Sequence, residues 1–309
     1  MQDKLLFISE ADVRQFLDFD ELLQTMEAAL IDLSAGQVTQ PLRTVLPVPA
    51  RRAWFGLMPA VYRDVIGAKL VTVFPENISL GLETHQALIQ LFDRETGVPL
   101  AVLEGKLITA WRTAAVSALA TRELARPDAR VLAILGSGVQ ARTHLRMLRM
   151  VRSFDEVRVW SRTPDHARRF AEEVGANVMT AEDAVRSADV VVTVTHSSQP
   201  VLHGEWLSPQ AHVNAVGAVG LHARELDDAA MRQSAVIVES TEAALQESGD
   251  IVHASVSIYA ELGQILSRNK PKPQSRNTIY KSLGVAVEDV AAARMIYRKF
   301  IGAPPRPGM

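Results

Sequence analysis

A glycine-rich turn in the middle of the chain has residue types and spacing that suggest nucleotide binding. The segment Gly136–Ala141 reads GSGVQA and joins the apolar run Val131–Leu135 to a helical pattern over Val139–Val151. In such a strand–turn–helix unit, the first glycine permits the tight turn and the second lets the backbone approach a pyrophosphate. Free N–H groups and the helix dipole then favour phosphate groups. The alternative is a glycine turn that binds no nucleotide. The expected dinucleotide contacts are Gly136, Gly138, Val139 and Gln140.

The residues after the next apolar strand indicate which dinucleotide binds. NAD-selective sites carry Asp or Glu at the end of this strand, where the carboxylate bonds the ribose 2′-hydroxyl. Here Val157–Trp160 is followed by Ser161, Arg162 and Thr163, without an acid. A guanidinium can bind a 2′-phosphate through two hydrogen bonds, and the two hydroxyls add donors. This pattern predicts NADPH/NADP rather than NAD. The alternative is that Arg162 is a solvated surface residue.

Three cations occupy positions where an unpaired charge is costly. Lys69 interrupts the apolar strand Ile66–Phe74, and Arg43 lies in a similar run. A buried charge requires a partner or water. Arg112 is expected in the first turn of a helix over Ala110–Leu124, where a cation opposes the helix dipole. One anionic ligand, either a substrate carboxylate or the cofactor phosphate, would compensate all three charges. Alternatively, Lys69 reaches solvent from a sheet edge and Arg43 is a surface residue.

A carboxylate follows one of the later strands. Asp227 lies beyond the strand His212–Val216, in the segment RELDD. Ligands bind beyond the carboxyl ends of parallel strands, so Asp227 is a candidate general acid. The spacing alone favours a plainer role, as the N-cap of a helix over Asp228–Gln233. Glu225 and Asp228 are the alternative acids.

The elements that position these residues form two groups. Residues 1–125 combine a helix at Asp20–Ser34 with short strands and a hairpin turn at Glu95–Gly97, which indicates an α+β domain with a mainly antiparallel sheet. Residues 126–281 alternate strands with helices, which is typical of an α/β, Rossmann-like doubly wound parallel sheet. The segment 282–309, with a helix over Ser282–Phe300, is expected to join the first domain. The expected strands are Arg43–Val48, Ala53–Met58, Ile66–Phe74, Gln86–Asp93 and Pro99–Glu104, then Val131–Leu135, Val157–Trp160, Asn177–Met179, Val190–Thr195, His212–Val216 and Val236–Glu239.

Composition narrows the class of protein. The chain has 309 residues, of which 48% are hydrophobic, a formal net charge of −2 and no cysteine. The mild acidity argues against a basic nucleic-acid surface, and the lack of cysteine excludes disulfides and thiolate chemistry. No apolar run approaches the roughly 18 residues of a membrane span, and no signal peptide is evident. The histidines show no HExxH spacing. We therefore expect a cytoplasmic protein without a metal, nucleic-acid or membrane partner.

Several stretches of this sequence resemble the ornithine cyclodeaminase/mu-crystallin family over nearly the whole length of the chain. The RTAA segment Arg112–Ala115, followed by the GxGxQA turn, is specific to that family. The other matching stretches are Pro41–Thr44, Met58–Ala60, Gly67–Lys69, Asn214–Ala218, Arg224–Asp227 and Lys281–Gly284.

The resemblance implies a role for each candidate residue. Arg43, Lys69 and Arg112 match residues that hold the substrate carboxylate. Asp227 matches the catalytic acid, and Lys69 is counted as catalytic as well. The family is homodimeric through its first domain, which implies a homodimer here. The implied cofactor contacts are Thr84, His85, Arg112, Thr113, Ser161, Arg162, Thr163, Thr195, His196, Val216 and Ser282.

The resemblance also implies an activity. The C-terminal half looks most similar to the mu-crystallin branch, which reduces cyclic ketimines with NADPH. This implies a substrate of the pyrroline-2-carboxylate or piperideine-2-carboxylate type and a cyclic amino acid as product. Cyclodeaminases carry an acid in the segment that corresponds to Trp54–Pro59 and another after the second Rossmann strand, and both are absent here. The alternatives are an ornithine cyclodeaminase, an alanine-type dehydrogenase, or a binding protein that holds NADPH and a small molecule without turnover.

Overall fold

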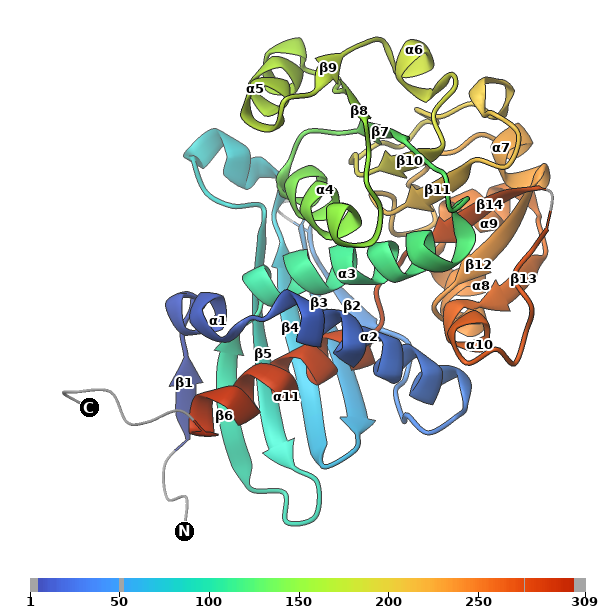
Figure 1. The fold of residues 1–309 in the computed structure, drawn as a ribbon. Coiled ribbons are helices and arrows are strands. Elements are labelled where there is room, and N and C mark those ends of the chain that lie inside the picture. The colour runs from blue at the N-terminus through green and yellow to red at the C-terminus, as the bar shows by residue number, and fades with distance from the viewer. Residues whose placement is uncertain (1–4, 50–52, 275, 303–309) are drawn as a thin grey trace. The chain divides into compact units, whose positions relative to one another are not determined.

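The computed structural model of the chain describes residues 5–49, 53–274 and 276–302, and it divides into two units (Figure 1). Unit 1 comprises Met1–Arg112 with Val285–Met309, and unit 2 comprises Thr113–Gly284. The first boundary lies within helix α3 (Lys106–Leu124), whereas the sequence predicted it at residue 125. The chain thus passes from one unit to the next through a helix. No Pro- or Gly-rich linker marks that point in the sequence.

Unit 1 is built on a six-stranded mixed sheet in the order β1-β6-β5-β4-β3-β2. Neighbouring strands are antiparallel except β1 and β6, which are parallel. The mainly antiparallel sheet expected here is confirmed, with β1 as an additional strand that is too short to show a pattern. The strands are β1 (Leu6–Ile8), β2 (Thr44–Val48), β3 (Ala53–Tyr62), β4 (Val65–Val73), β5 (His85–Asp93) and β6 (Pro99–Glu104).

The N-terminal helices of unit 1 are α1 (Glu10–Phe16) and α2 (Phe19–Ser34). Asp18 is the N-cap of α2, and its side chain accepts a hydrogen bond from Glu21 N at 2.9 Å. Such a cap satisfies one of the N–H groups that have no partner within the helix. The apolar side chains of α2 recur at helical spacing and are buried, which agrees with the predicted helix: Leu22, Met26, Ala29 and Leu30.

The last helix, α11 (Ala286–Gly302), packs on α2 and on strands β3 and β4 of the same unit. The approach is close, because a Cβ atom on Gly67 of β4 would lie 2.8 Å from Val290 Cγ2. Every second residue of β4 is buried, and Lys69 has the same parity as Gly67. Lys69 therefore lies on the sheet face that α11 covers.

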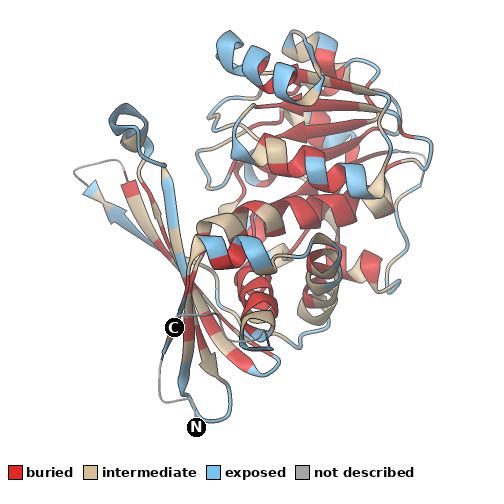
Figure 2. Cartoon of the chain, turned by 60° about the vertical axis from the view of Figure 1, so that its left-hand side comes forward, coloured by how far each residue is buried: buried red, intermediate tan, exposed pale blue. Residues whose placement is uncertain are grey.

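Unit 2 is built on an eight-stranded sheet in the order β13-β12-β14-β11-β10-β7-β8-β9, in which every pair is parallel. Most of its central strands are buried along their whole length (red in Figure 2). This explains their continuous apolar runs, because helices cover both faces of a parallel sheet. The strands are β7 (Val131–Leu135), β8 (Glu156–Trp160), β9 (Asn177–Val178), β10 (Val190–Thr193), β11 (His212–Ala215), β12 (Ser234–Val238), β13 (Ile258–Glu261) and β14 (Asn277–Lys281).

The helices of unit 2 connect these strands, and the Rossmann-like α/β class is confirmed. Strand order reverses at β7, since β8 follows on one side and β10 on the other. In open parallel sheets a ligand binds at such a reversal, beyond the carboxyl ends of the strands. The helices are α4 (Val139–Val151), α5 (Pro164–Val174), α6 (Ala181–Val185), α7 (Asp228–Arg232), α8 (Thr241–Glu247), α9 (Gly249–Ala254) and α10 (Leu262–Leu266).

Two of the expected helices begin several residues away from their predicted starts. The helix predicted from Ala110 begins at Lys106, because Glu104 caps it by accepting hydrogen bonds from Lys106 N and Leu107 N. The helix predicted from Ser282 begins at Ala286. The residues before it form strand β14, which is buried throughout. Its sequence NTIYK is largely polar, so no buried strand was predicted there.

The described residues lack both a membrane-spanning helix and a metal-binding cluster. No helix in them combines the length and the apolar character needed to cross a membrane. No group of three or more His, Asp or Glu side chains in them is arranged to hold a metal ion.

Candidate functional site

A buried ionic cluster in unit 1 brings together two of the predicted cations. Lys69 is 3% exposed, and its Nζ lies 2.5 Å from Asp289 Oδ2. Arg112 is 4% exposed and donates from Nε to Asp289 Oδ1 at 3.0 Å and from Nη1 to Glu288 Oε2 at 2.5 Å. Asp289 and Glu288 are fully buried in the first turn of α11. One carboxylate, that of Asp289, therefore holds both cations.

The helix-dipole argument for Arg112 was wrong. Because α3 begins at Lys106, Arg112 lies in its second turn rather than its first. The N-terminus of α3 has its own anion, the capping carboxylate of Glu104. Arg112 requires anions because it is buried, and α11 supplies them.

The sequence reasoning missed Glu288 and Asp289. The expected compensating anion was a ligand, whereas the structure supplies the carboxylates of Asp289 and Glu288. A signal was present, since two adjacent acids interrupt an otherwise apolar helical run, AVEDVAAA. Two acids on the buried side of a helix need cationic partners as much as a lysine in a strand needs an anion.

Arg43 belongs to the same electrostatic environment. It lies just before β2 and is partly exposed, and its charge is among those that act on the Lys69 ammonium. The pKa of Lys69 is lowered to about 8, chiefly by burial and also by Arg112 and Arg43, while Asp289 acts in the opposite direction. Burial raises the pKa of Asp289, but Arg112 and Lys69 outweigh this and hold it below the ordinary value. Lys69 is thus coupled to two guanidinium groups and to the Asp289 carboxylate.

The glycine turn of unit 2 has the geometry that a pyrophosphate requires. Gly136 has φ +127°, and a Cβ atom there would lie 2.7 Å from Val194 O, so only glycine fits. Gly138 is the N-cap of α4, and a Cβ on it would meet nothing within 4 Å. The space beside the N-terminus of α4 is therefore open, and its first turn contains no acid. These features fit a nucleotide phosphate bound by backbone N–H groups.

The predicted 2′-phosphate residues lie next to this turn. Gly136 N donates to Trp160 O at 2.8 Å, and the hydroxyls of Ser137 and Ser161 are 3.0 Å apart. Arg162 is exposed and forms no ion pair with any residue that the structure describes. Thr163 is the N-cap of α5, and its side chain makes no capping hydrogen bond.

The other predicted cofactor residues are spread over both units. In unit 1, Thr84 and His85 precede and begin β5, and their side chains bond each other at 2.9 Å. In unit 2, the Thr195 hydroxyl bonds Glu225, and His196 is exposed. The Ser282 hydroxyl is buried and donates to Glu239 at 2.9 Å. The remaining two, Thr113 in α3 and Val216 after β11, are buried.

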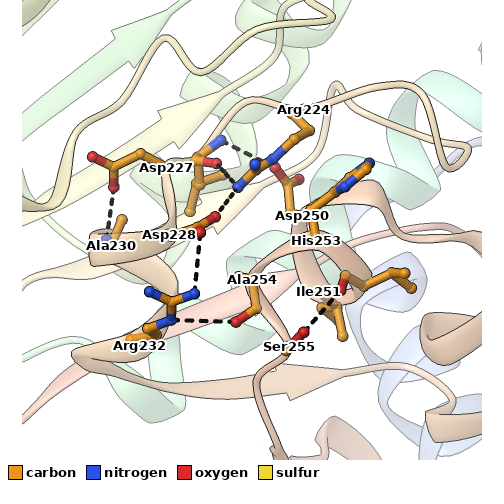
Figure 3. A network of polar contacts seen from close by, with 12 residues as sticks. Arg224, Asp227, Asp228, Ala230, Arg232, Asp250, Ile251, His253, Ala254 and Ser255 are labelled. Carbon is orange, nitrogen blue, oxygen red and sulfur yellow. Dashed lines mark hydrogen bonds and ion pairs between the residues drawn. The ribbon is translucent and has the colours of Figure 1, made fainter.

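Asp227 is the N-cap of α7, as the plainer interpretation of its spacing predicted. Its Oδ1 accepts hydrogen bonds from Ala230 N at 2.7 Å and Gly204 N at 3.0 Å, and its Oδ2 lies 3.1 Å from His203 Nδ1. Figure 3 shows Asp227 directed toward Ala230, while Asp228 is held by two arginines. The acid role of Asp227 stays a prediction.

Comparison with known proteins agrees with these features. The model of the ornithine cyclodeaminase/mu-crystallin family matches residues 3–303. The chain belongs to this family. Ketimine reductase mu-crystallin of Mus musculus is 46% identical over 300 residues, which cover 94% of this chain and 96% of that protein.

Two solved structures share the family fold. The Delta(1)-pyrroline-2-carboxylate reductase of Thermococcus litoralis, in complex with NADH and L-proline, has a TM-score of 0.92 at 35% identity and covers 96% of this chain and 98% of its own. An archaeal alanine dehydrogenase dimer with bound NAD has a TM-score of 0.91 at 30% identity and covers 96% of both chains. The expectation of an NAD(P)-dependent imine reductase of the ornithine cyclodeaminase/mu-crystallin family is thereby confirmed.

Two substitutions separate the capping role of Asp227 from its predicted acid role. Asp227→Asn keeps an N-cap side chain, whereas Asp227→Ala removes it and should lower stability by about 1 kcal/mol. If the carboxyl group donates the substrate proton, both variants lose about 100-fold or more in kcat. Steady-state kinetics and thermal unfolding of the two variants measure this. An Asp227→Asn protein with normal kcat would exclude the acid role and show that Asp227 serves only as the N-cap of α7.

Proposed function

We propose that this chain reduces cyclic ketimine carboxylates, of the pyrroline-2-carboxylate or piperideine-2-carboxylate type, to cyclic amino acids with NADPH. The observation that carries the proposal is the buried cluster in which Asp289 holds Lys69 and Arg112. The fit of the glycine turn to a pyrophosphate and the reductases among the relatives support it.

The cluster suits a substrate carboxylate. Lys69 and Arg112 are fixed by α11 before any ligand binds, so little side-chain freedom is lost on binding. Arg43 acts on the charge of Lys69, so a third cation contributes to the electrostatic environment that a substrate carboxylate would meet. Arg43 is the partly exposed member of the group and the one best able to meet a ligand. A guanidinium and an ammonium together recognise a carboxylate through charge-assisted hydrogen bonds.

The reaction needs a hydride and a proton. A bound nicotinamide dinucleotide supplies the hydride. The hydride forms a C–H bond at the imine carbon, a proton forms an N–H bond at the imine nitrogen, and the C=N double bond becomes a single bond. Arg43, Lys69 and Arg112 orient the substrate through its carboxylate, which is an entropic contribution to the rate. Asp227, or a water molecule that it holds, is proposed to provide the proton.

The choice of NADPH rests on Arg162. Its guanidinium is exposed and forms no ion pair within the described chain, and it stands between two hydroxyl side chains at the N-terminus of α5. A 2′-phosphate would gain a charge-assisted bidentate contact there, and no carboxylate would repel it. The Thermococcus litoralis relative was solved with NADH, so the preference for NADPH is proposed from this chain's own residues.

We also propose that the chain is a homodimer. Phe7 and Leu88 are 65% and 42% exposed on the six-stranded sheet of unit 1. Residue parity places Leu88 on the face opposite to that of Lys69 and α11. Exposed apolar residues on an uncovered sheet face are typical of an interface. The dimeric archaeal alanine dehydrogenase supports this, and the molar mass by light scattering tests it.

The assay for the proposed function compares two reactions. With NADPH and pyrroline-2-carboxylate or piperideine-2-carboxylate, the purified chain should oxidise NADPH and form proline or pipecolate. With ornithine it should release no ammonia, because no acid lies in the Trp54–Pro59 segment to engage the second amine. Ammonia release from ornithine, or NADPH binding without turnover of either imine, would contradict the proposal.

Cofactor preference is predicted to depend on Arg162. Arg162→Ala removes the 2′-phosphate contact, so the KM for NADPH should rise about tenfold or more while that for NADH stays the same. Arg168→Ala on the exposed face of α5 is the control, because Arg168 is already paired with Asp165. Equal preference for the two dinucleotides in wild type and in Arg162→Ala would exclude this role.

The pH dependence of substrate binding should follow the charge of Lys69. Above the Lys69 pKa of about 8 the ammonium is neutral, so the KM for the imine carboxylate should rise. Asp289→Asn removes the carboxylate that opposes this loss of charge, and the rise should begin at lower pH. The same substrate is used throughout, so its own titration cancels in the comparison.

A matched control is a carboxylate between β3 and β4 that pairs with the same helix, α11. Asp64 binds Arg294 and Arg298 of α11 and lies outside the cluster, so Asp64→Asn should keep the wild-type pH profile. Identical profiles for Asp289→Asn and wild type would show that Asp289 does not set the charge of Lys69.

A further inference from the structure

One fully buried carboxylate joins two loops at the carboxyl edge of the parallel sheet. Glu225 Oε1 accepts hydrogen bonds from Thr195 N and Thr195 Oγ1, both at 2.6 Å. Its Oε2 accepts from Gly217 N at 2.7 Å and from Thr193 Oγ1 at 2.8 Å. Thr193 ends β10 and Thr195 follows it, while Gly217 lies in the turn after β11. Glu225 therefore fixes the ends of two neighbouring strands to each other.

The two loops approach each other so closely that only glycine fits between them. A Cβ atom on Gly217 would lie 2.0 Å from Thr195 O and 2.6 Å from Glu225 Oε1. The backbone joins them as well, since Val216 N donates to Thr193 O at 2.9 Å. The two loops therefore meet at Gly217, directly beside the Glu225 carboxylate.

A second set of buried charges holds Glu225 itself. Asp250 Oδ1 accepts from Glu225 N at 2.9 Å and from Leu226 N at 3.1 Å. Lys281, at the end of β14, lies 3.1 Å from Asp250 Oδ2 and donates to Ala218 O at 2.6 Å. Asp250 and Lys281 are both fully buried. The network therefore ties the end of β14 to the same turn after β11.

The donors around Glu225 match an ionised carboxylate. Two are backbone N–H groups, which can only donate, and each carboxylate oxygen takes one of them together with a threonine hydroxyl. Burial raises the pKa of Glu225 above its ordinary value, although Lys281 and the threonine donors act in the opposite direction. A glutamine here would place an NH₂ group against a donor and leave a buried N–H without an acceptor.

The position of the network connects it with one half of the cofactor. Doubly wound dinucleotide folds consist of two halves, each of which binds one mononucleotide. The glycine turn and Arg162 lie with β7 and β8, on the adenosine side by the proposed function. The loops that Glu225 joins follow β10 and β11, on the other side of the strand-order reversal.

We propose that Glu225 is a positioning residue that holds the two loops after β10 and β11 in the arrangement required by the nicotinamide half of the cofactor. This rests on the proposed use of a nicotinamide dinucleotide at this sheet edge. Glu225 itself is buried behind Thr195 and Gly217 and acts through them.

The test compares binding of the whole cofactor with binding of its adenosine half. In Glu225→Gln the affinity for 2′,5′-ADP should stay within about twofold of wild type, while that for NADPH should fall about tenfold or more. Titration calorimetry measures both. A loss shared equally by NADPH and 2′,5′-ADP, or no loss for either, would overturn the proposal.

A matched control disturbs the opposite end of the same strand. Asp189, directly before β10, accepts from Arg130 N at 2.8 Å and Val131 N at 2.9 Å. Asp189→Asn should lower the melting temperature without changing the ratio of NADPH to 2′,5′-ADP affinity. A changed ratio in this variant would mean that general loosening of the sheet, and not Glu225, explains the effect.

A milder variant keeps the test decisive if Glu225→Gln does not fold. Thr193→Val preserves the β-branched shape of a strand residue and removes one of the four donors to Glu225. It should weaken NADPH more than 2′,5′-ADP, in the same direction as Glu225→Gln, and an unchanged ratio would count against the proposal. Failure of the wild type to reduce imines would overturn the proposed function, whereas the binding ratio alone decides the role of Glu225.

Discussion

The ion pair between Lys69 and Asp289 is the interaction on which unit 1 depends. A lysine on the covered face of a sheet and two acids on the covered side of a helix are each unfavourable alone, and each is tolerated because the other is present. Removing one partner of such a buried pair typically costs roughly 3–5 kcal/mol. Apolar residues of similar volume would fill the same space without burying any charge. The charges are therefore best explained by what they bind rather than by the stability that they add.

Unit 2 uses charge in a similar way. Glu225, Asp250 and Lys281 are fully buried, and their hydrogen bonds reach backbone groups at the ends of β10, β11 and β14. Parallel strands end in loops, and these loops lose conformational entropy when they become ordered. A carboxylate that accepts from two loops at once orders both with one side chain. In each unit, then, a buried carboxylate fixes groups that the proposed chemistry needs in place.

Local sequence patterns were sufficient for part of this account. The GSGVQA turn needs one particular backbone at Gly136, so its residue types identify it, and helix α4 begins and ends where the pattern predicts. Strands buried on both faces were recognised from their apolar runs. Strand β14 was not, because its Asn, Thr, Tyr and Lys side chains are satisfied by distant partners such as Glu239 and Asp250. Asp289 was missed for the same reason, since its partners lie far away in the chain. Asp227 shows the converse case, in which local spacing favoured the cap that the structure contains.

The central claim is that the Lys69 cluster recognises a carboxylate on the substrate. The most direct measurement compares kcat/KM for pyrroline-2-carboxylate with kcat/KM for 1-pyrroline, the same ring without its carboxylate, in wild type and in Lys69→Met. Because each preference is a ratio within one protein sample, a loss of folded protein does not affect it. The account predicts a strong preference for the carboxylated ring in wild type and a reduction of about tenfold or more in Lys69→Met. The same preference in both proteins would contradict it.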